Sequence, residues 1–406
     1  MPGFRAILFR LHWALGLTAG LVLAVVGATG ALLSYEEALT ALANRDRATV
    51  PARAAEPLGP EALLARLAAA APGLRVDALT FAAAPEGSPR ARFARDPATG
   101  ARPPALYLDP YDGAPLGPVR GEAGFSAVRD LHRWLLVPGG GDGWGRTVTG
   151  ACALALLAFL ATGLYLRWPR IHTWRIWLRP ALARPGRARW WSLHAVLGTW
   201  LAPVYLVIVL SGLTWSYEAY KAGATWLLTG QTTRMRPDGP RTERGAGAPR
   251  PAPALDRAWA AFRAGEGREA ALATLTVPET GPIRIRWQAR DGVGRNDATF
   301  DAATGAPHAV DRHADKPLGR QIADNMLEVH RGRFFGDAAA LLFCLAALLM
   351  PGFAATGLTL YVLRRRARRG RAAPRSRNPE GTGPFGGAAG RSPAGGPSLS
   401  KPGLQA

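Results

Sequence analysis

Cysteine is scarce in this sequence of 406 residues, and so is charge. The two cysteines, Cys152 and Cys344, lie inside long apolar runs, which argues against a structural disulfide or a zinc site and favours small buried side chains. Only 19% of the residues are charged, whereas 48% are hydrophobic. This balance fits either a large soluble core or several membrane spans, so the distribution of apolar residues has to decide.

Charge is absent altogether from four stretches, residues 14–34, 147–166, 195–217 and 338–363. Each can cross a membrane, because about 20 helical residues with a rise of about 1.5 Å each cover a hydrocarbon core of roughly 30 Å. A core helix of a soluble protein would carry a polar stripe over such a length, and none of these stretches does. The sequence therefore predicts four transmembrane helices in a lipid bilayer.

Acidic residues are few beside basic ones, 29 against 50, which gives a net charge of +21. A basic domain with interleaved aromatic residues is missing, so nucleic acid is not an expected partner. The arginines gather instead in the acid-free linker 167–190 and directly after residue 363. By the positive-inside rule these segments and both termini are cytoplasmic, and we expect a multi-pass protein of a bacterial inner membrane.

The chain contains an internal duplication. Residues 11–38 align without a gap on residues 193–220, with Leu-His, Leu-Gly and Ser-Tyr-Glu at matching positions, so His12 matches His194. Arg5 and the apolar run after it also resemble a secretory signal peptide. The run is too long for that, and its copy lies in mid-chain, so we interpret it as a span.

The second and fourth spans also correspond. The sequences LHRW at 131–134 and VHRG at 329–332 precede them, so His132 matches His330. Each of these spans ends in Ala-Thr-Gly-Leu. A glycine-rich insertion, 137–142, follows only the first of the two histidines, and we expect it to be a flexible loop, since no strand precedes it and no Gly-Lys-Ser follows.

The two long segments outside the membrane share an order of features: an Ala-rich helix, strand-like runs and an Asp-x-x-x-Gly-Ala-Pro turn. The helices are predicted at 60–71 and 255–264, strands at 105–108 and 283–287, and the turns at 109–115 and 301–307. Each segment is predicted to be a small α+β domain. Residues 236–253 and those after 372 are rich in Pro and Gly and are predicted to be a linker and a disordered tail.

These features divide the chain into eight parts. They are 1–34 (cytoplasmic N-terminus and first span), 35–146 (first outer domain), 147–166 (second span), 167–194 (cytoplasmic Arg- and Trp-rich loop), 195–217 (third span), 218–336 (second outer domain), 337–363 (fourth span) and 364–406 (cytoplasmic, disordered basic tail).

Four of the seven histidines occupy equivalent places at the ends of the spans. His12 and His194 lie at the cytoplasmic ends of the first and third spans, whereas His132 and His330 lie outside, just before the second and fourth. A haem iron binds one imidazole on each face of its ring, so two histidines on facing helices at one depth satisfy its axial positions. The two pairs predict two haems with these histidines as iron ligands.

Other roles for these histidines stay open. A single histidine at a helix end is as often an interfacial or hydrogen-bonded residue without a cofactor, and only the joint symmetry favours haem. Zinc usually needs three or four protein ligands that include cysteine or carboxylate, and no such cluster accompanies the pairs. His172, His308 and His313 have no partner in the repeat, and we expect them to be solvated loop residues.

Small and basic residues beside the histidines fit a bulky cofactor. Gly16 and Gly198 lie one helical turn from the first histidine of each half, where a missing side chain leaves room for a ring. Glycine is also common where membrane helices approach closely, and packing alone can explain the Thr/Ser-Gly pair of every span. Arg133 and Arg331 follow the outer histidines and can pair with haem propionates, or remain solvated or bound to lipid phosphate.

Together these motifs resemble the PepSY-associated transmembrane family, whose members include ferric-siderophore reductases of the inner membrane. The motifs are Leu11-His12 with Leu15-Gly16 and Thr29-Gly30, Leu131-His132-Arg133, Leu193-His194 with Leu197-Gly198 and Ser211-Gly212, and Val329-His330-Arg331. The Asp-x-x-x-Gly turns are similar to those that end PepSY modules. The resemblance extends over roughly residues 5–366 and departs from the family in the glycine insertion and in the Ala- and Arg-rich loops.

The resemblance implies an all-α four-helix transmembrane bundle, a tandem repeat of two helix pairs, with two small α+β PepSY-like periplasmic domains. It also implies b-type haem and an oxidoreductase that reduces a periplasmic Fe(III)-siderophore, or another Fe(III) chelate, to release Fe(II). The chain has no dinucleotide fingerprint, so the electron donor would be a quinol or a separate reductase. The alternative is a non-enzymatic membrane protein whose PepSY-like domains regulate a protease or another partner.

Overall fold

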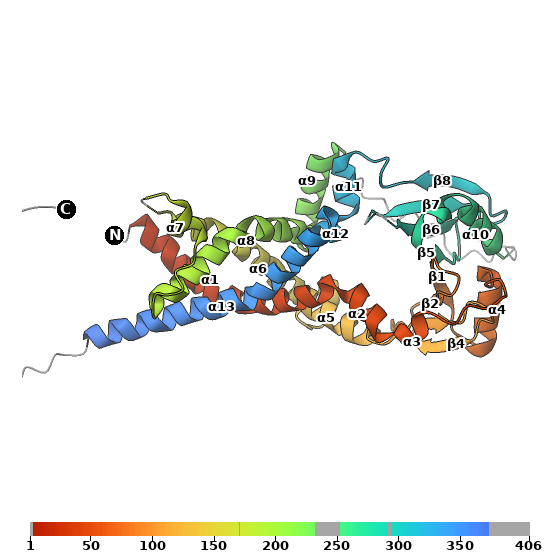
Figure 1. The fold of residues 1–406 in the computed structure, drawn as a ribbon, viewed down its shortest axis with the longest axis horizontal. Helices are drawn as coiled ribbons and strands as arrows, with labels where there is room; N and C mark the ends of the chain where they lie inside the picture. Colours follow the sequence, from red (N-terminus) through yellow and green to blue (C-terminus); the bar gives the residue numbers. More distant parts are fainter. Residues whose placement is uncertain (1–2, 170, 232–251, 291, 293, 373–406) are drawn as a thin grey trace, which may run out of the picture. The chain divides into compact units, whose positions relative to one another are not determined.

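The computed structural model describes residues 3–169, 171–231, 252–290, 292 and 294–372 (Figure 1). The linker predicted at 236–253 lies almost wholly outside the described residues, and the part of the predicted tail after residue 372 lies wholly outside them.

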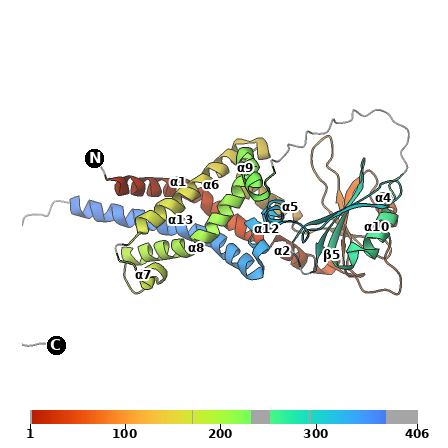
Figure 2. The same cartoon turned by 90° about the horizontal axis from the view of Figure 1, so that it is seen from above.

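Four of the described helices are long and apolar enough to cross a membrane, as predicted. They are α1 (Phe4–Ser34), α6 (Trp144–Arg167), α8 (Arg187–Ser216) and α13 (Asp337–Ala372). Figures 1 and 2 show them running alongside one another. The fourth helix continues to Ala372, which corrects the predicted start of the tail at residue 364. Arginine and alanine, both strong helix formers, dominate this extension.

Apolar side chains pack the long helices together in two clusters. The first joins α6 to α1 and α8 through Leu23, Cys152, Leu156, Val209 and Leu213. The second joins α8 to α13 through Leu201, Val204, Tyr205, Phe343 and Ala346. A Cβ added at Gly27 of α1 would stand 2.6 Å from the carbonyl oxygen of Ala347 on α13. Close approach of this kind is typical of membrane helices, whose association depends on van der Waals packing.

Shorter helices connect the spans to the rest of the chain. They are α2 (Glu36–Ala43), α3 (Arg45–Ala48), α5 (Glu122–Trp134), α7 (Trp174–Leu178), α9 (Glu218–Thr229), α11 (Leu318–Asp324) and α12 (Met326–His330), with single 3₁₀ turns η1 (Gly140–Asp142), η2 (Glu266–Arg268) and η3 (Arg333–Phe335). The predicted flexible loop at 137–142 thus contains η1. Helices α5 and α12 each precede a span, and they carry the two outer histidines.

Eight described strands form one antiparallel sheet in the order β4-β3-β2-β1-β5-β6-β7-β8 (Figure 1). They are β1 (Val76–Ala82), β2 (Arg90–Phe93), β3 (Leu106–Leu108), β4 (Pro115–Pro118), β5 (Ala270–Thr276), β6 (Ile283–Ala289), β7 (Asn296–Phe300) and β8 (Pro307–Asp311). Each half of the chain contributes four consecutive strands. The strands predicted at 105–108 and 283–287 correspond to β3 and β6.

The two halves share this sheet, although the sequence predicts two separate α+β domains. Strand β1 pairs with β5 and places Leu79 opposite Leu275, both fully buried. Unpaired, these two strands would each expose an edge of free backbone groups, and pairing satisfies both. Helices α4 (Pro60–Ala70) and α10 (Leu255–Ala264), close to the predicted ranges, pack their apolar side chains into the core of the shared sheet.

In each half the predicted Asp-x-x-x-Gly turn connects the last two strands, β3 to β4 and β7 to β8. The Oδ1 atom of Asp109 accepts a hydrogen bond from the N–H of Tyr111, and Oδ1 of Asp301 accepts one from the N–H of Thr304, both at 2.8 Å. Gly113 and the equivalent glycine at 305 have φ angles of 74° and 73°. This left-handed conformation favours glycine, which accounts for its place in the motif.

Candidate functional site

The structure brings the four repeat-related histidines together in two pairs. His12 of α1 faces His194 of α8 with ring centres 6.3 Å apart, and the ring planes meet at 80°. His132 of α5 faces His330 of α12 with ring centres 6.5 Å apart and an angle of 73°. Each pair takes one histidine from each half of the chain, as the repeat predicts.

A hydroxyl group from a span lies against the Nδ1 atom of each histidine. The contacts are Thr162 to His12 at 2.8 Å, Thr29 to His132 at 3.1 Å, Thr356 to His194 at 2.8 Å and Ser211 to His330 at 2.9 Å. These four residues are the hydroxyl members of the Thr/Ser-Gly pairs that recur in every span. The motif therefore does more than allow close packing of helices, because its hydroxyl groups also contact the histidines.

The direction of these hydrogen bonds follows from the second contact of each hydroxyl. Every one donates its proton to the backbone carbonyl four residues earlier in its helix, at 2.5 to 2.8 Å. Its oxygen then accepts a hydrogen bond from the histidine, which must carry its proton on Nδ1. Nδ1 of His132 lies also 2.9 Å from the carbonyl oxygen of Val26, which can only accept.

This tautomer leaves the Nε2 lone pair of each histidine free for a ligand. Burial lowers the pKa of His132, and burial together with the neighbouring His132 lowers the pKa of His330 to about 4. Both imidazoles of the outer pair are therefore neutral near pH 7. A neutral imidazole is the form that binds a metal ion.

The glycine of each Thr/Ser-Gly pair makes room for the imidazole. A Cβ added at Gly30 would stand 3.0 Å from Cε1 of His132, and one at Gly212 would stand 3.2 Å from Cε1 of His330. At the inner pair there is more room: a Cβ added at Gly163 would stand 3.5 Å from Cε1 of His12, and one at Gly357 would stand 3.9 Å from Cε1 of His194. A larger residue at the outer positions would push the ring away from the hydroxyl beside it.

Two phenylalanines that the sequence analysis did not identify complete the inner pair. Phe159 meets the ring of His12 edge-on, and Phe353 meets His194 in the same way, both with centres 5.3 Å apart. Each lies three residues before the threonine that binds the same histidine. The repeated pattern Phe-x-x-Thr-Gly is the sequence signal that could have revealed them.

The two pairs lie at different depths along the same helices. The first span carries His12 and, 17 positions later, Thr29, which contacts the outer pair. The third span repeats this separation between His194 and Ser211. At about 1.5 Å per residue the pairs are about 25 Å apart along the helix axis, which is most of a hydrocarbon core of about 30 Å.

The spacing within each pair fits two axial ligands of a haem iron. With metal–nitrogen bonds of about 2.0 Å and ring centres about 1.1 Å behind the nitrogens, two such imidazoles would have centres about 6.2 Å apart. The observed values are 6.3 and 6.5 Å.

The predicted cofactor glycines differ in their surroundings. A Cβ added at Gly16 would meet no atom within 4 Å, so open space lies beside the inner pair on α1. At Gly198 the same atom would lie 3.6 Å from the ring of Phe353. Gly16 thus lies where a planar group can enter, whereas the space at Gly198 is partly taken by an aromatic side chain.

The two arginines expected to pair with propionates are placed differently. Arg331 forms an ion pair with Glu37 at 2.8 Å, so its charge is already compensated. Arg133 stacks on the ring of Trp134 at 4.5 Å and lines a cavity of about 200 Å³. Burial and the neighbouring Arg146 lower the pKa of Arg133, as expected where positive charges gather. Arg133 is therefore suited to bind an anionic group, whereas Arg331 already has Glu37 as its counterion.

Ion pairs from one short helix position both outer histidines. Glu36 and Glu37 are the first residues of α2, directly after the first span. Glu36 pairs with Arg129, one turn before His132 on α5, and Glu37 pairs with the arginine next to His330. The outer pair is thereby linked to α2 from both halves of the chain.

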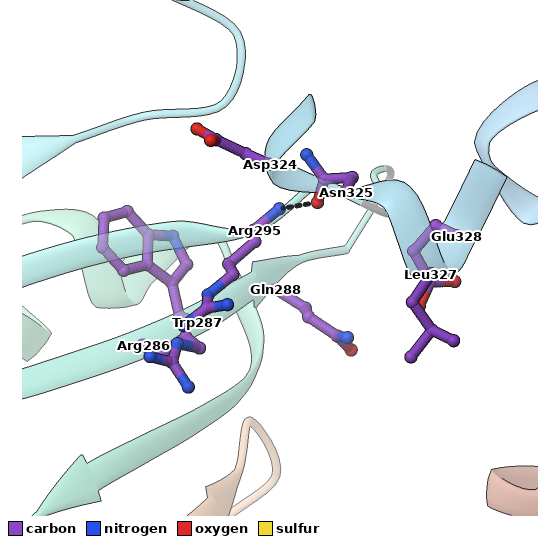
Figure 3. A pocket seen from close by; sticks show the side chains of 8 residues that line it. All are labelled: Arg286, Trp287, Gln288, Arg295, Asp324, Asn325, Leu327 and Glu328. Carbon is purple, nitrogen blue, oxygen red and sulfur yellow. Dashed lines mark hydrogen bonds between the residues drawn. The ribbon is translucent and has the colours of Figure 1, made fainter. Parts of the chain in front are cut away.

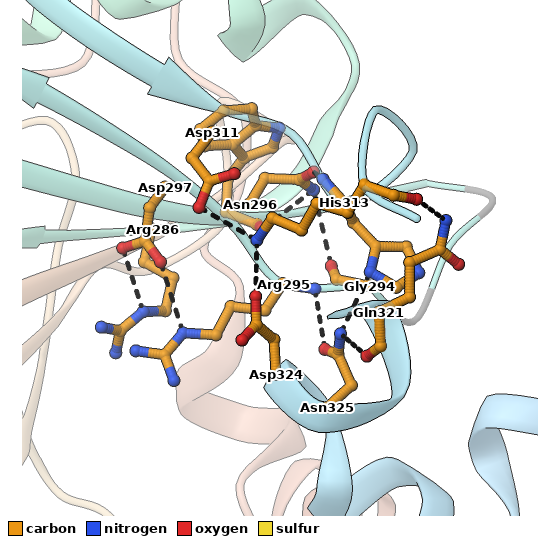
Figure 4. A network of polar contacts seen from close by, with 12 residues as sticks. Arg286, Gly294, Arg295, Asn296, Asp297, Asp311, His313, Gln321, Asp324 and Asn325 are labelled. Carbon is orange, nitrogen blue, oxygen red and sulfur yellow. Dashed lines mark hydrogen bonds and ion pairs between the residues drawn. The ribbon is translucent and has the colours of Figure 1, made fainter. Parts of the chain in front are cut away.

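The sheet holds the other end of the helix that carries His330. Asn325, the N-cap residue of α12, accepts a hydrogen bond from the N–H of Arg295 at 3.0 Å, and its amide lies 3.0 Å from Nδ1 of His313 (Figure 4). His313 is therefore part of a polar network, which corrects the expectation of a solvated loop residue. A cavity of about 210 Å³ lies beside this junction between β6, β7 and α12 (Figure 3).

The remaining histidines are placed near the surface. His308 lies on the edge strand β8 and is exposed, as expected. His172 is exposed and stacks on Trp177 with ring centres 5.9 Å apart. Neither lies in a pair like those of the four repeat-related histidines.

A known protein family matches most of the chain. The family model described as PepSY-associated TM region matches residues 9–364, which include the charge-free stretches of all four spans and the whole sheet. No curated protein matches the chain in a sequence comparison.

Proposed function

Because this multi-pass membrane protein belongs to the PepSY-associated TM region family, we propose that it is an oxidoreductase that carries electrons across a bacterial inner membrane through two b-type haems. The main support for the proposal is that the four histidines form two pairs, with ring centres 6.3 and 6.5 Å apart. In each pair a hydroxyl group lies against the Nδ1 atom of both histidines. The separation of the two pairs, about 25 Å along the helices, suits a relay between the two faces.

Each bound haem would supply a one-electron redox centre. The protein's own part is to bind, orient and shield it. His12 and His194 would hold the inner haem, and His132 and His330 the outer one. All four histidines are half-buried among the helices, and the hydroxyls keep the proton of each histidine on Nδ1, so that Nε2 stays free to bind iron.

The proposed substrate is an Fe(III)-siderophore or a similar ferric chelate on the periplasmic side. One electron reduces Fe(III) to Fe(II), which hard oxygen ligands hold less tightly, so iron is released. A quinol, which gives up two electrons and two protons, or a separate reductase would supply the electrons. The outer pair is the one next to the sheet, because Asn325, which directly precedes α12, accepts a hydrogen bond from the N–H of Arg295, directly before β7.

The proposal is tested by replacing the histidines singly. Purified wild-type protein should show a Soret band and a reducible α band, and a redox titration should resolve two centres. His12→Ala and His194→Ala should remove the same centre and leave the other, because both residues bind one iron. His132→Ala and His330→Ala should remove the second. The exposed His308→Ala is the matched control and should retain both.

Two outcomes would contradict the proposal. Wild-type protein without a Soret band would exclude haem, and loss of both centres from every single variant would leave the pairing unsupported. In proteoliposomes, reduced protein should be reoxidised by a ferric siderophore on the periplasmic face, and His132→Ala should block this. If no ferric chelate reoxidises the protein but another oxidant does, the electron relay stands and the substrate class is wrong.

A further inference from the structure

We propose that the four hydroxyls of the Thr/Ser-Gly pairs are positioning residues that set the redox potentials of the two centres, and that the inner centre depends on them more than the outer one. They are Thr162 and Thr356 at the inner pair, and Thr29 and Ser211 at the outer pair. The inference rests on the proposed haem function and concerns residues that would not touch the haem iron.

The chemistry follows from the direction of the hydrogen bonds. A histidine that donates its Nδ1 proton to an acceptor gains electron density at Nε2, and a more basic ligand stabilises the oxidised metal. Removing the acceptor should therefore raise the reduction potential of that centre. The hydroxyl can act only as acceptor here, because its own proton is committed to the carbonyl four residues earlier, as in the 2.8 Å bond from Thr356 to Gly352.

Other threonines of the spans also donate their proton to the carbonyl four residues earlier, a contact that we call the back-bond. They do so without a histidine as second partner. Thr359 makes the same bond to the carbonyl of Ala355 at 2.8 Å, and Thr199 makes it to Ala195 at 2.8 Å. Neither forms a hydrogen bond with a histidine in the part of the chain that the structure describes. These four hydroxyls therefore differ from Thr149, which also precedes a glycine and makes the back-bond but donates to the carbonyl of Arg133 instead.

The two centres differ in what remains when a hydroxyl is lost. Nδ1 of His132 has the carbonyl of Val26 at 2.9 Å as a second acceptor, and His330 has a backbone contact to Ile208 three residues before its serine. For His12 and His194 the described residues provide only the threonine hydroxyl. An inner histidine would thus keep a buried N–H without a partner, whereas an outer one would keep its carbonyl.

The test uses haem-loaded protein and a spectroelectrochemical titration. Thr162→Val removes the hydroxyl at nearly constant volume, and Thr162→Ser keeps it. Thr359→Val is the control, because Thr359 makes the same back-bond but no hydrogen bond to a histidine among the described residues. We expect Thr162→Val, and likewise Thr356→Val, to raise the potential of the inner centre enough to change the ratio of reduced to oxidised haem about tenfold at fixed potential, equivalent to about 59 mV. Thr162→Ser and Thr359→Val should stay near wild type.

At the outer pair, Thr29→Val and Ser211→Ala should shift only the outer centre, and by less than the inner variants shift theirs. The unaffected centre in each molecule reports that the bundle is folded. Loss of the inner haem from Thr162→Val but not from Thr162→Ser would support the same role, since the two differ in the hydroxyl. Unchanged potentials in haem-loaded valine variants would overturn this inference alone, whereas wild-type protein without haem would overturn the proposed function and the inference with it.

Discussion

At the scale of single residues, Asn325 connects the sheet to the outer histidine pair. Its side-chain oxygen accepts from the N–H of Arg295, and its amide donates to the carbonyl of Gln321 and to Nδ1 of His313. An amide nitrogen can only donate, so Nδ1 of His313 must be the acceptor and the ring must be neutral. The start of α12, and with it His330, therefore depends on an uncharged histidine.

This dependence predicts a response to acid. Burial, and after it the positive charge of Lys316, lowers the pKa of His313, and Asp324 opposes this only in part. Because the pKa is lowered, the hydrogen bond to Asn325 contributes its full stabilisation above pH of about 6.5, the pKa of histidine in an unfolded chain. This stabilisation is lost as the pH falls through the pKa of His313 in the folded protein. Besides Asn325, Lys316 and Asp324, the ring faces Phe334, which does not titrate.

We expect the amide protons of residues 325–329 to lose protection against hydrogen exchange as the pH falls from 7 to 5, corrected for intrinsic exchange rates, by at most about fivefold. The size follows from a net hydrogen-bond contribution of about 1 kcal/mol. His313→Gln, which stays uncharged at both pH values, is the control and should show no such pH response. An equal loss of protection in wild type and variant would mean that another group titrates.

At the scale of elements, the pairing of β1 with β5 makes one domain out of two repeats. Thr80 and Thr274 share a hydrogen bond between their side-chain oxygens at 3.0 Å across this seam. At the N-termini of α4 and α10, Oδ1 of Asp256 accepts from the N–H of Glu61 at 2.9 Å, and Oε1 of Glu61 accepts from the N–H of Asp256 at 3.1 Å. Each repeat thus caps the helix of the other.

If the two repeats fold as one unit, a cavity at the seam should destabilise both. Leu275→Ala removes a fully buried side chain opposite Leu79, and we expect it to cost about 2 to 5 kcal/mol of the free energy of unfolding of the sheet. Urea titration followed by tryptophan fluorescence measures this change. Val310→Ala, on the exposed edge strand β8, should cost less than about 0.5 kcal/mol. Two separate unfolding transitions in wild-type protein would contradict a single unit.

At the scale of the whole molecule, the arrangement of charge predicts how the chain is oriented in the membrane. Arginines follow the second and fourth spans closely, whereas those of the two long segments are scattered through domain-sized regions, which count little in the positive-inside rule. Arg167, the last residue of α6, is nevertheless buried and donates to the carbonyls of Ile176 and Trp177. It organises the linker in addition to contributing charge.

The orientation can be checked with reporters that are active only outside the cytoplasm. Fusions after Ala84 or Ala261, in the two long segments, should be active. Fusions after Ala183 or Ala372, in the arginine-rich linker and beyond the fourth span, should be inactive. The reverse pattern would place the His132–His330 pair on the cytoplasmic side and would exchange the roles of the two proposed centres.

Much of the site could be predicted from the sequence, because the duplication shows equivalence without any coordinates. The match of His12 with His194, and of His132 with His330, already states which residues should pair. The Thr/Ser-Gly motif is visible in the sequence too, but the histidine that each of its hydroxyls contacts is not. Thr29 and His132 are 103 positions apart, and nothing in a single sequence relates a span hydroxyl to a histidine on another helix.

The sequence by itself determined the four membrane helices, the repeat and the identity of the paired histidines, since apolar length and internal similarity are properties of the chain alone. Only the tertiary structure decided that the two outer domains share one sheet, that Arg331 is paired with Glu37, and that each Nδ1 meets a hydroxyl. These contacts depend on which surfaces meet when the two halves pack together. Strand edges, charges and hydrogen-bond donors can each be satisfied by several partners, and the choice among them is made by the packing of the whole fold.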